Sequence, residues 1–426
     1  MVLFMGMLAL PANGAHFKKI NDLKFIELCK LGTVQDVIDA INSGANVNAK
    51  DENGRTALMW AAGNNKDVAV VIALLNHGAE VNFAIQDYYD KDHDMTALMW
   101  AAKGNKNSAI IKVLIEAGAD VNASRRVSNK QETTWWVNET ALVLAAQWNT
   151  IEIVNVLMEA GAKVSDRALL RAARNNTSEV IDALIKAGAD INATEGVMNC
   201  NTVLMNAAEE NTPQVVETLI KAGANVNDVG SWGNTALMIA AEKNVPEVAE
   251  VLIKAGAEVN ARGWDGWTPL LWAAKGNKNP KMIHTLIEAG AEDVFDENGD
   301  TALMIAIENN TTDVVKALIE AGSDVNHKGK YGGTPLGRSI YFANSPGIIV
   351  ALIKAGANVN ITFEDGVTML MKASQHCTPE VIDAFLDVGV NAKARDRHNR
   401  KAIAYALGNP KLKGTSTLRR LEVACR

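Results

Sequence analysis

The sequence predicts an all-α solenoid of about twelve helix–turn–helix units. A threonine recurs at 33-residue intervals, at Thr202, Thr235, Thr268, Thr301 and Thr334. Each of these residues precedes a short apolar run, a second amphipathic stretch and a Gly-Ala or Gly-Ser step. A single unit of this size cannot bury its own apolar face, so it must stack on its neighbours.

The unit spanning residues 233–260 illustrates each element. Thr235 occupies a helix-start position before an apolar run rich in small residues. Pro246 ends that helix and opens the next, because proline suits a first-turn position. The second helix carries its apolar stripe at Val248, Val251, Leu252 and Ala255. Gly256 then supplies a left-handed C-terminal residue before an extended exit.

Unit lengths vary in the first half of the chain. Thr56, Thr96 and Thr140 are separated by 40 and 44 residues, which predicts enlarged fingers at 83–94 and 123–139. A finger is missing near 163–167. The predicted organisation is an N-terminal capping repeat at 15–48, an array at 49–398 and a basic C-terminal capping repeat at 399–426. Insertions in repeats map to one face, often the binding face.

The repeated motifs resemble ankyrin repeats over roughly residues 20–426. The matching residues are Thr268-Pro269-Leu270 and Thr334-Pro335-Leu336, Ala-Ala pairs at 61–62, 101–102 and 273–274, and Gly-Ala-x-Val-Asn at 118–122, 223–227, 256–260 and 356–360. The resemblance implies extended β-hairpin-like fingers. It also implies a scaffold that binds other proteins along a concave face made by finger tips and inner helices.

One departure from the ankyrin pattern is consistent. Methionine replaces the usual histidine at Met59, Met99, Met205, Met238, Met304 and Met371. Because a thioether is apolar, we expect these methionines not to make that histidine's hydrogen bonds. Cohesion between units is then expected to depend more on packing.

Charge is distributed unevenly along the chain. The net charge is −7, which argues against general nucleic-acid binding. Residues 391–426 nevertheless carry ten Lys or Arg and only two acidic residues, Asp396 and Glu422. The rest of the chain has a negative net charge. This basic end is either a polar cap or a docking patch for an acidic partner or lipid headgroups.

The four cysteines lie in distant repeats and are expected to be separate thiols.

Residues 1–14 do not fit the repeat. Their apolar run precedes Ala12-Asn13-Gly14, a small-x-small pattern that a signal peptidase could cut, but no basic region precedes it. The segment predicts a truncated signal peptide and a secreted or periplasmic protein. The alternative is an apolar N-terminal segment over the first repeat of a cytoplasmic protein. No other stretch approaches the roughly 18 apolar residues of a membrane span.

No motif indicates an enzyme or a cofactor. The seven histidines lack metal-ligand spacing, and neither a nucleophile elbow nor a phosphate-binding loop occurs. Asp90, Asp92 and Asp94 match the start of a calcium loop, but Met95 and Ala101 replace its glycine and final glutamate. These aspartates form either a weak calcium site or a solvated acidic finger.

The aromatic residues indicate the binding surface. Trp60, Trp100 and Trp272 share one repeat position and are predicted to be core. Finger-tip aromatics are predicted to bind a partner, or else to stack on one another: Trp232, Trp264, Trp267 and Tyr331. An inserted loop contains Trp135 and Trp136, near Arg125 and Arg126. These tryptophans are predicted either to form a second contact patch or to fold back onto the protein. Trp148 ends its inner helix and, by family geometry, faces the concave groove.

The sequence therefore predicts a non-enzymatic protein–protein interaction module. The alternative is recognition of a small molecule or glycan by the finger aromatics. A third hypothesis is an enzyme whose site is assembled from the 83–94 finger.

Overall fold

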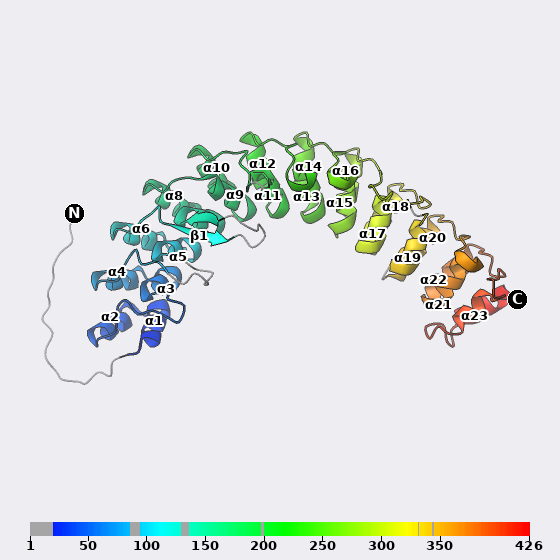
Figure 1. Ribbon diagram of the computed structural model, residues 1–426, viewed down its shortest axis with the longest axis horizontal. Helices are drawn as coiled ribbons and strands as arrows, with labels where there is room; N and C mark the ends of the chain where they lie inside the picture. The colour runs from blue at the N-terminus through cyan, green and yellow to red at the C-terminus, as the bar shows by residue number, and fades with distance from the viewer. Residues whose placement is uncertain (1–19, 86–93, 129–135, 197–199, 331, 343–344) are drawn as a thin grey trace. The chain divides into compact units, whose positions relative to one another are not determined.

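A computed structural model describes residues 20–85, 94–128, 136–196, 200–330, 332–342 and 345–426. These residues form twelve successive helix pairs, which confirms the predicted all-α repeat fold. Figure 1 shows the odd-numbered first helices along one side of each unit and the even-numbered second helices along the other. Within the described part of the chain, no helix combines the length and apolarity that crossing a membrane requires.

The first helices of the pairs are α1 (Asp22–Leu31), α3 (Ala57–Asn64), α5 (Ala97–Gly104), α7 (Ala141–Trp148), α9 (Asp166–Asn175), α11 (Val203–Glu210), α13 (Ala236–Lys243), α15 (Pro269–Gly276), α17 (Ala302–Asn309), α19 (Pro335–Phe342), α21 (Met369–His376) and α23 (Ala402–Ala406). The second helices are α2 (Val34–Asn42), α4 (Val68–Asn76), α6 (Ser108–Glu116), α8 (Ile151–Glu159), α10 (Ser178–Lys186), α12 (Pro213–Lys221), α14 (Pro246–Lys254), α16 (Pro280–Glu288), α18 (Thr312–Glu320), α20 (Pro346–Lys354), α22 (Pro379–Asp387) and α24 (Ser416–Cys425).

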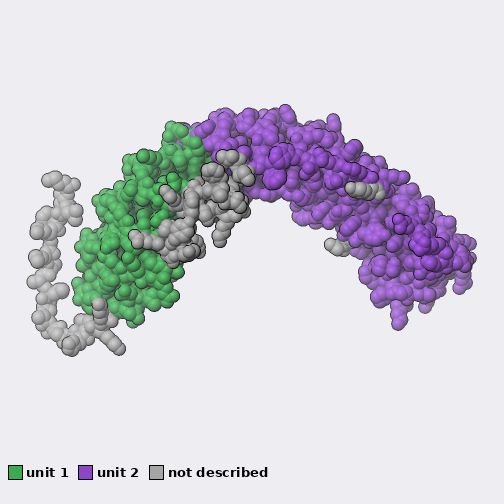
Figure 2. Space-filling model, viewed as in Figure 1, with its two compact units in different colours: residues 1–172, 186–189 green, residues 173–185, 190–426 purple. Residues whose placement is uncertain are grey.

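The chain divides into two compact units (Figure 2). Unit 1 comprises residues 1–172 and 186–189, and unit 2 comprises residues 173–185 and 190–426. Within unit 1, each first helix packs on the next, from α1 through α3 and α5 to α7. The same neighbour-to-neighbour packing joins α11 through α23 in unit 2. Its buried side chains, among them Leu237, Val248 and Leu252, fill the layers between successive helices.

Local chemistry sets the helix boundaries where the sequence predicts them. The hydroxyl of Thr235 accepts the backbone N–H of Met238 and caps α13. Pro246 opens α14 at the first turn, where its missing N–H costs nothing. Gly256 has φ +90°, the left-handed conformation that ends the second helix.

The methionines contribute more than packing, so the expectation for them was partly wrong. The Met59 sulfur accepts the Thr56 backbone N–H at 3.4 Å while the Thr56 hydroxyl accepts the Met59 N–H. The same reciprocal cap occurs at Met205, Met238 and Met371. A thioether is a weak acceptor, but it satisfies a donor that the helix start would otherwise leave open.

Asparagine side chains link many of the successive repeats in two parallel sets. The first set caps the first helices: Asn277 donates from Nδ2 to the carbonyls of Ala241 (2.9 Å) and Asn244 (2.8 Å) in the preceding repeat. We call these bonds the helix rungs. Their donors are Asn65, Asn105, Asn149, Asn211, Asn244, Asn277, Asn310 and Asn409.

The second set follows the second helices. Asn260 donates to the Gly290 carbonyl at 3.0 Å and accepts the Glu292 N–H at 2.9 Å, so one side chain makes two bonds to the next repeat. We call these bonds the exit rungs. They are made by Asn48, Asn82, Asn122, Asn227, Asn260 and Asn326.

Neighbour-only packing predicts a local response to core damage. Leu237 is fully buried in α13, so Leu237→Ala should cost roughly 2–5 kcal/mol. The substitution should separate unfolding into two blocks, because stability in a repeat array is a sum of local terms. Urea unfolding followed by circular dichroism measures this. A single cooperative transition, merely shifted to lower urea, would contradict the prediction.

Candidate partner-binding surface

Two tryptophans project from adjacent finger tips of unit 2. Trp232 is 69 % exposed and Trp264 is 65 % exposed, and their rings meet edge to face at 5.6 Å. Each lies in a single 3₁₀ turn, Ser231–Gly233 or Trp264–Gly266. A Cβ at Gly233 would lie 2.7 Å from the Trp264 ring and 2.8 Å from its backbone nitrogen. The two rings therefore contact each other and still remain largely exposed to solvent.

The backbone of Trp232 is strained. Its φ of +62° lies in the left-handed region, which bulky residues rarely adopt. The corresponding positions of two other fingers hold Asp265 and Asp365 at φ +60° and +67°, a residue type that tolerates this conformation. Trp232 is therefore a large, exposed apolar side chain at a position where two other fingers of this chain have aspartate.

A second aromatic cluster lies beside this pair in sequence. Trp267 is half-buried against Trp272, with ring centroids 4.8 Å apart, so it is less exposed than its neighbours. The Lys275 ammonium lies 4.5 Å from the Trp272 ring centroid and 5.3 Å from that of Trp267. The Trp272 indole N–H is shielded and has no hydrogen-bond partner among the described residues.

Unit 1 carries its own row of aromatics on successive first helices. Trp60 and Trp100 lie 5.9 Å apart, and the Arg55 guanidinium lies within 5.7 Å of both rings. These tryptophans contact the adjacent repeat as expected, but they and Trp272 are half-buried rather than core. Trp148, at the end of α7, is 50 % exposed.

The 123–139 finger contains a two-stranded antiparallel sheet of β1 (Ser124–Ser128) and β2 (Trp136–Thr140). Arg125 pairs across it with Glu139 at 2.6 Å, and both side chains are buried. Arg167 and Arg171 of α9 lie within 3.9 Å of the same carboxylate. Arg125 therefore holds the base of the finger and is not available as a contact-patch residue.

Several predicted site residues lie outside the described residues: Tyr331, Trp135, Asp90, Asp92 and the predicted signal segment 1–14. Trp136 belongs to β2, but its side chain is not among those described. Asp94 closes the base of the 83–94 finger by donating its backbone N–H to the Ile85 carbonyl. Among the described residues, no group of three His, Cys, Asp or Glu side chains could hold a metal ion.

All four cysteines are free thiols, as expected. Cys29 is buried in α1, and burial raises the pKa of its thiol to about 12. It is therefore a packing residue rather than a reactive nucleophile.

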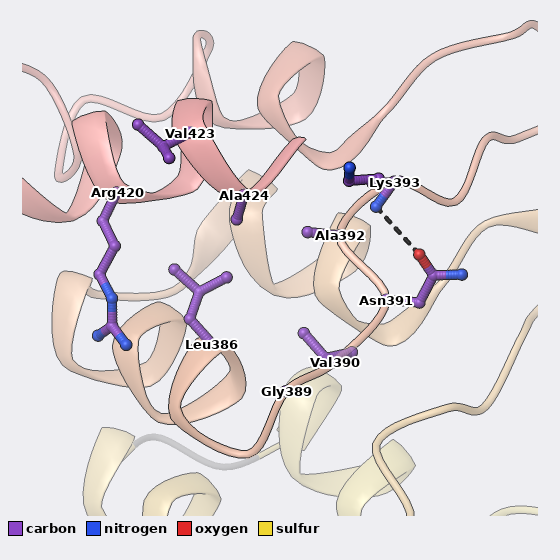
Figure 3. Close-up of a pocket in the computed structure, with 9 residues that line it drawn as sticks. All are labelled: Leu386, Gly389, Val390, Asn391, Ala392, Lys393, Arg420, Val423 and Ala424. Carbon is purple, nitrogen blue, oxygen red and sulfur yellow. Dashed lines mark hydrogen bonds between the residues drawn. The ribbon is translucent and has the colours of Figure 1, made fainter. Parts of the chain in front are cut away.

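A shallow hollow lies between the last two repeats, where α22, α24 and the loop after α22 meet (Figure 3). Its apolar lining includes Leu386, Val390 and Val423, with Lys393 and Arg420 at its edge. Arg420 also pairs with Asp383 at 3.1 Å and Asp387 at 2.6 Å on α22. Part of the basic charge of the C-terminal repeat is therefore paired with carboxylates of the preceding repeat.

The strain at Trp232 predicts a stability gain on replacement. Trp232→Asn should raise the free energy of unfolding by about 1 kcal/mol relative to Trp264→Asn, because asparagine tolerates the left-handed conformation. Both variants lose the same ring contact, so their difference isolates the backbone term. Thermal and urea unfolding of the two variants measure it. Equal stabilities would contradict the proposed strain.

Comparison with protein-family models agrees with this architecture. A family model described as ankyrin repeats (three copies) matches residues 25–125, 126–195, 169–263 and 261–329. Among solved structures, the human ASB11 ankyrin repeat domain is 24 % identical, covering 56 % of this chain and 99 % of that chain with a TM-score of 0.46. No curated protein matches the sequence.

Ankyrin arrays generally bind proteins and are typically non-enzymatic scaffolds, and the match identifies no catalytic domain. Because the matched segments span more than half of the sequence, the chain belongs to the ankyrin repeat family.

Proposed function

We propose that this protein is an interaction module that binds a protein partner across its finger tips and the ends of its first helices. The observation that carries the proposal is the Trp232–Trp264 pair, two adjacent indoles each about two-thirds exposed. Large aromatics are the residues on which binding energy concentrates in protein interfaces.

The backbone at Trp232 supports a binding role over a structural one. Strain in a bulky residue persists where the surrounding structure enforces it, and it clusters at functional sites. The pair buries little of its own surface, so stacking alone does not account for it. Burial of both rings against a partner would remove this exposed apolar surface from water and so contribute favourably to the binding free energy.

Recognition of a glycan by the same indoles is the competing function. Sugars stack on open aromatic faces, but these two rings are inclined at 77°. The edge of one ring meets the other, so the pair offers no continuous flat platform. This geometry favours a protein partner.

Affinity capture with the full chain tests the proposal. The bait is compared with Trp232→Ala/Trp264→Ala and with Leu407→Ala, a control that alters another strongly exposed apolar residue. We expect a partner retained by the wild type and the control to be lost, or weakened at least tenfold, by the double variant. This loss corresponds to about 1.4 kcal/mol of binding free energy.

Two results would count against the proposal. Retention of the same proteins by all three baits would assign the tryptophans a structural role. A change in tryptophan fluorescence on titration with soluble sugars, lost in the double variant and without any protein captured, would favour the glycan function instead.

A further inference from the structure

The hollow between α22, α24 and the loop after α22 has an apolar floor that is open to solvent. Its volume is about 600 Å³, within the range of ligand pockets, roughly 300–1,000 Å³. Figure 3 shows Leu386, Val390 and Val423 around the same space. Leu386 is half-buried and Val390 is buried, whereas Val423 is 66 % exposed. The hollow therefore offers an aliphatic surface that a side chain of another molecule could cover.

One edge of the hollow carries a lysine where other repeats carry a bridging asparagine. The exit-rung asparagines lie four residues after the glycine that ends the second helix, as Asn260 does after Gly256. The corresponding residues here are Gly389 and Lys393, and both line the hollow. The Lys393 side chain is exposed, and within the described part of the chain its ammonium group has no hydrogen-bond or ion-pair partner. A position that elsewhere joins repeats thus holds an unpaired cation.

The α24 side of the hollow carries a second unpaired cation. Arg419 lies four residues before Val423, so the two side chains share one face of α24. The Arg419 side chain is exposed and, among the described residues, has neither a hydrogen bond nor an ion pair. Glu422 is the one acidic residue of α24.

Other cations of the basic end are already neutralised. Arg420 pairs with Asp383 and Asp387, and Arg400 pairs with Asp396 at 2.8 Å. None of the residues that line the hollow is acidic. The available positive charge beside the hollow therefore comes from Lys393 and Arg419.

We propose that this hollow is a second binding surface, which takes an acidic peptide segment of a protein partner. An aliphatic side chain of the segment lies against Leu386, Val390 and Val423, and flanking carboxylates meet Lys393 and Arg419. Opposite charge selects the segment and orients it, while the apolar contact holds it in place. The inference goes beyond the proposed function, because it assigns a surface distinct from the finger-tip tryptophans.

The arrangement favours a peptide over a lipid surface. Proteins that lie on membranes insert apolar side chains that project beyond their cations. Here Leu386 and Val390 form the floor of a hollow, so they are reached only by a group that enters it. A peptide can place one side chain there and its carboxylates at the edge.

Fluorescence anisotropy with a defined probe tests this assignment. The probe is a labelled heptapeptide, Glu-Asp-Glu-Leu-Glu-Asp-Glu, and its controls replace the central Leu with Gly or every acidic residue with Lys. We expect the full chain to bind the probe at least tenfold more tightly than either control peptide. Binding should weaken with added salt, because exposed charges are screened.

Two matched pairs of variants locate the site. Lys393→Met/Arg419→Met should weaken binding of the probe at least tenfold, whereas Lys112→Met/Lys316→Met removes two exposed lysines elsewhere and should leave it within twofold. Val423→Asp should also weaken binding at least tenfold. Leu407→Asp adds the same charge to the same repeat at another exposed apolar residue and should have less than a threefold effect. Circular dichroism melts verify that all variants are folded.

Equal binding of the probe by Val423→Asp and Leu407→Asp would overturn the inference, because it would reduce the site to general charge attraction. No binding at millimolar protein would overturn it as well. Binding to phosphatidylserine vesicles that Lys393→Met/Arg419→Met weakens, without binding of the probe, would replace the peptide with a lipid surface. Trp232→Ala/Trp264→Ala should bind the probe normally. If capture depends on that pair while the probe fails, this inference falls and the proposed function stands.

Discussion

The architecture depends on how one repeat is tied to the next. Packing between helices is non-directional, whereas the asparagine rungs fix register: Asn277 reaches two carbonyls of the preceding repeat, and Asn260 makes two bonds to the next. These carbonyls and N–H groups lie at helix ends, where no helical partner exists. An unmet buried polar group costs about 1–3 kcal/mol, so a one-residue slip between repeats is penalised at the buried helix rungs, such as the bond from Asn277 to the Ala241 carbonyl.

Stiff local stacking explains why fingers can carry unfavourable residues. The turn at Trp232 is supported by the next finger, which approaches so closely that only glycine fits at position 233. The neighbouring finger thus supports an exposed indole on a left-handed backbone. Binding residues placed on a rigid repeat lose little conformational entropy when a partner associates. The half-buried tryptophans of the first helices are positioned in the same way by the helices beneath them.

Local rules predict the repeat well and its side-chain contacts less well. Threonine caps, first-turn prolines and C-terminal glycines act within a few residues, so Thr235, Pro246 and Gly256 identify their elements correctly. Long-range partners are harder to predict. The methionine thioether accepts a backbone N–H, Trp100 is half-buried, and Arg125 pairs with buried Glu139. The helix rungs escaped sequence reasoning, although asparagine recurs every 33 residues at Asn211, Asn244, Asn277 and Asn310. That spacing was the available signal.

Hydrogen exchange of Asn277→Ala, measured by mass spectrometry beside the wild type, tests the rung account most directly. Loss of the side chain leaves the carbonyls of Ala241 and Asn244 without their Nδ2 donor. The account predicts faster exchange confined to α13–α16, with unchanged protection in α21 and α22. Unchanged protection everywhere, or a uniform loss across unit 2, would show that the rungs do not set the cohesion of neighbouring repeats.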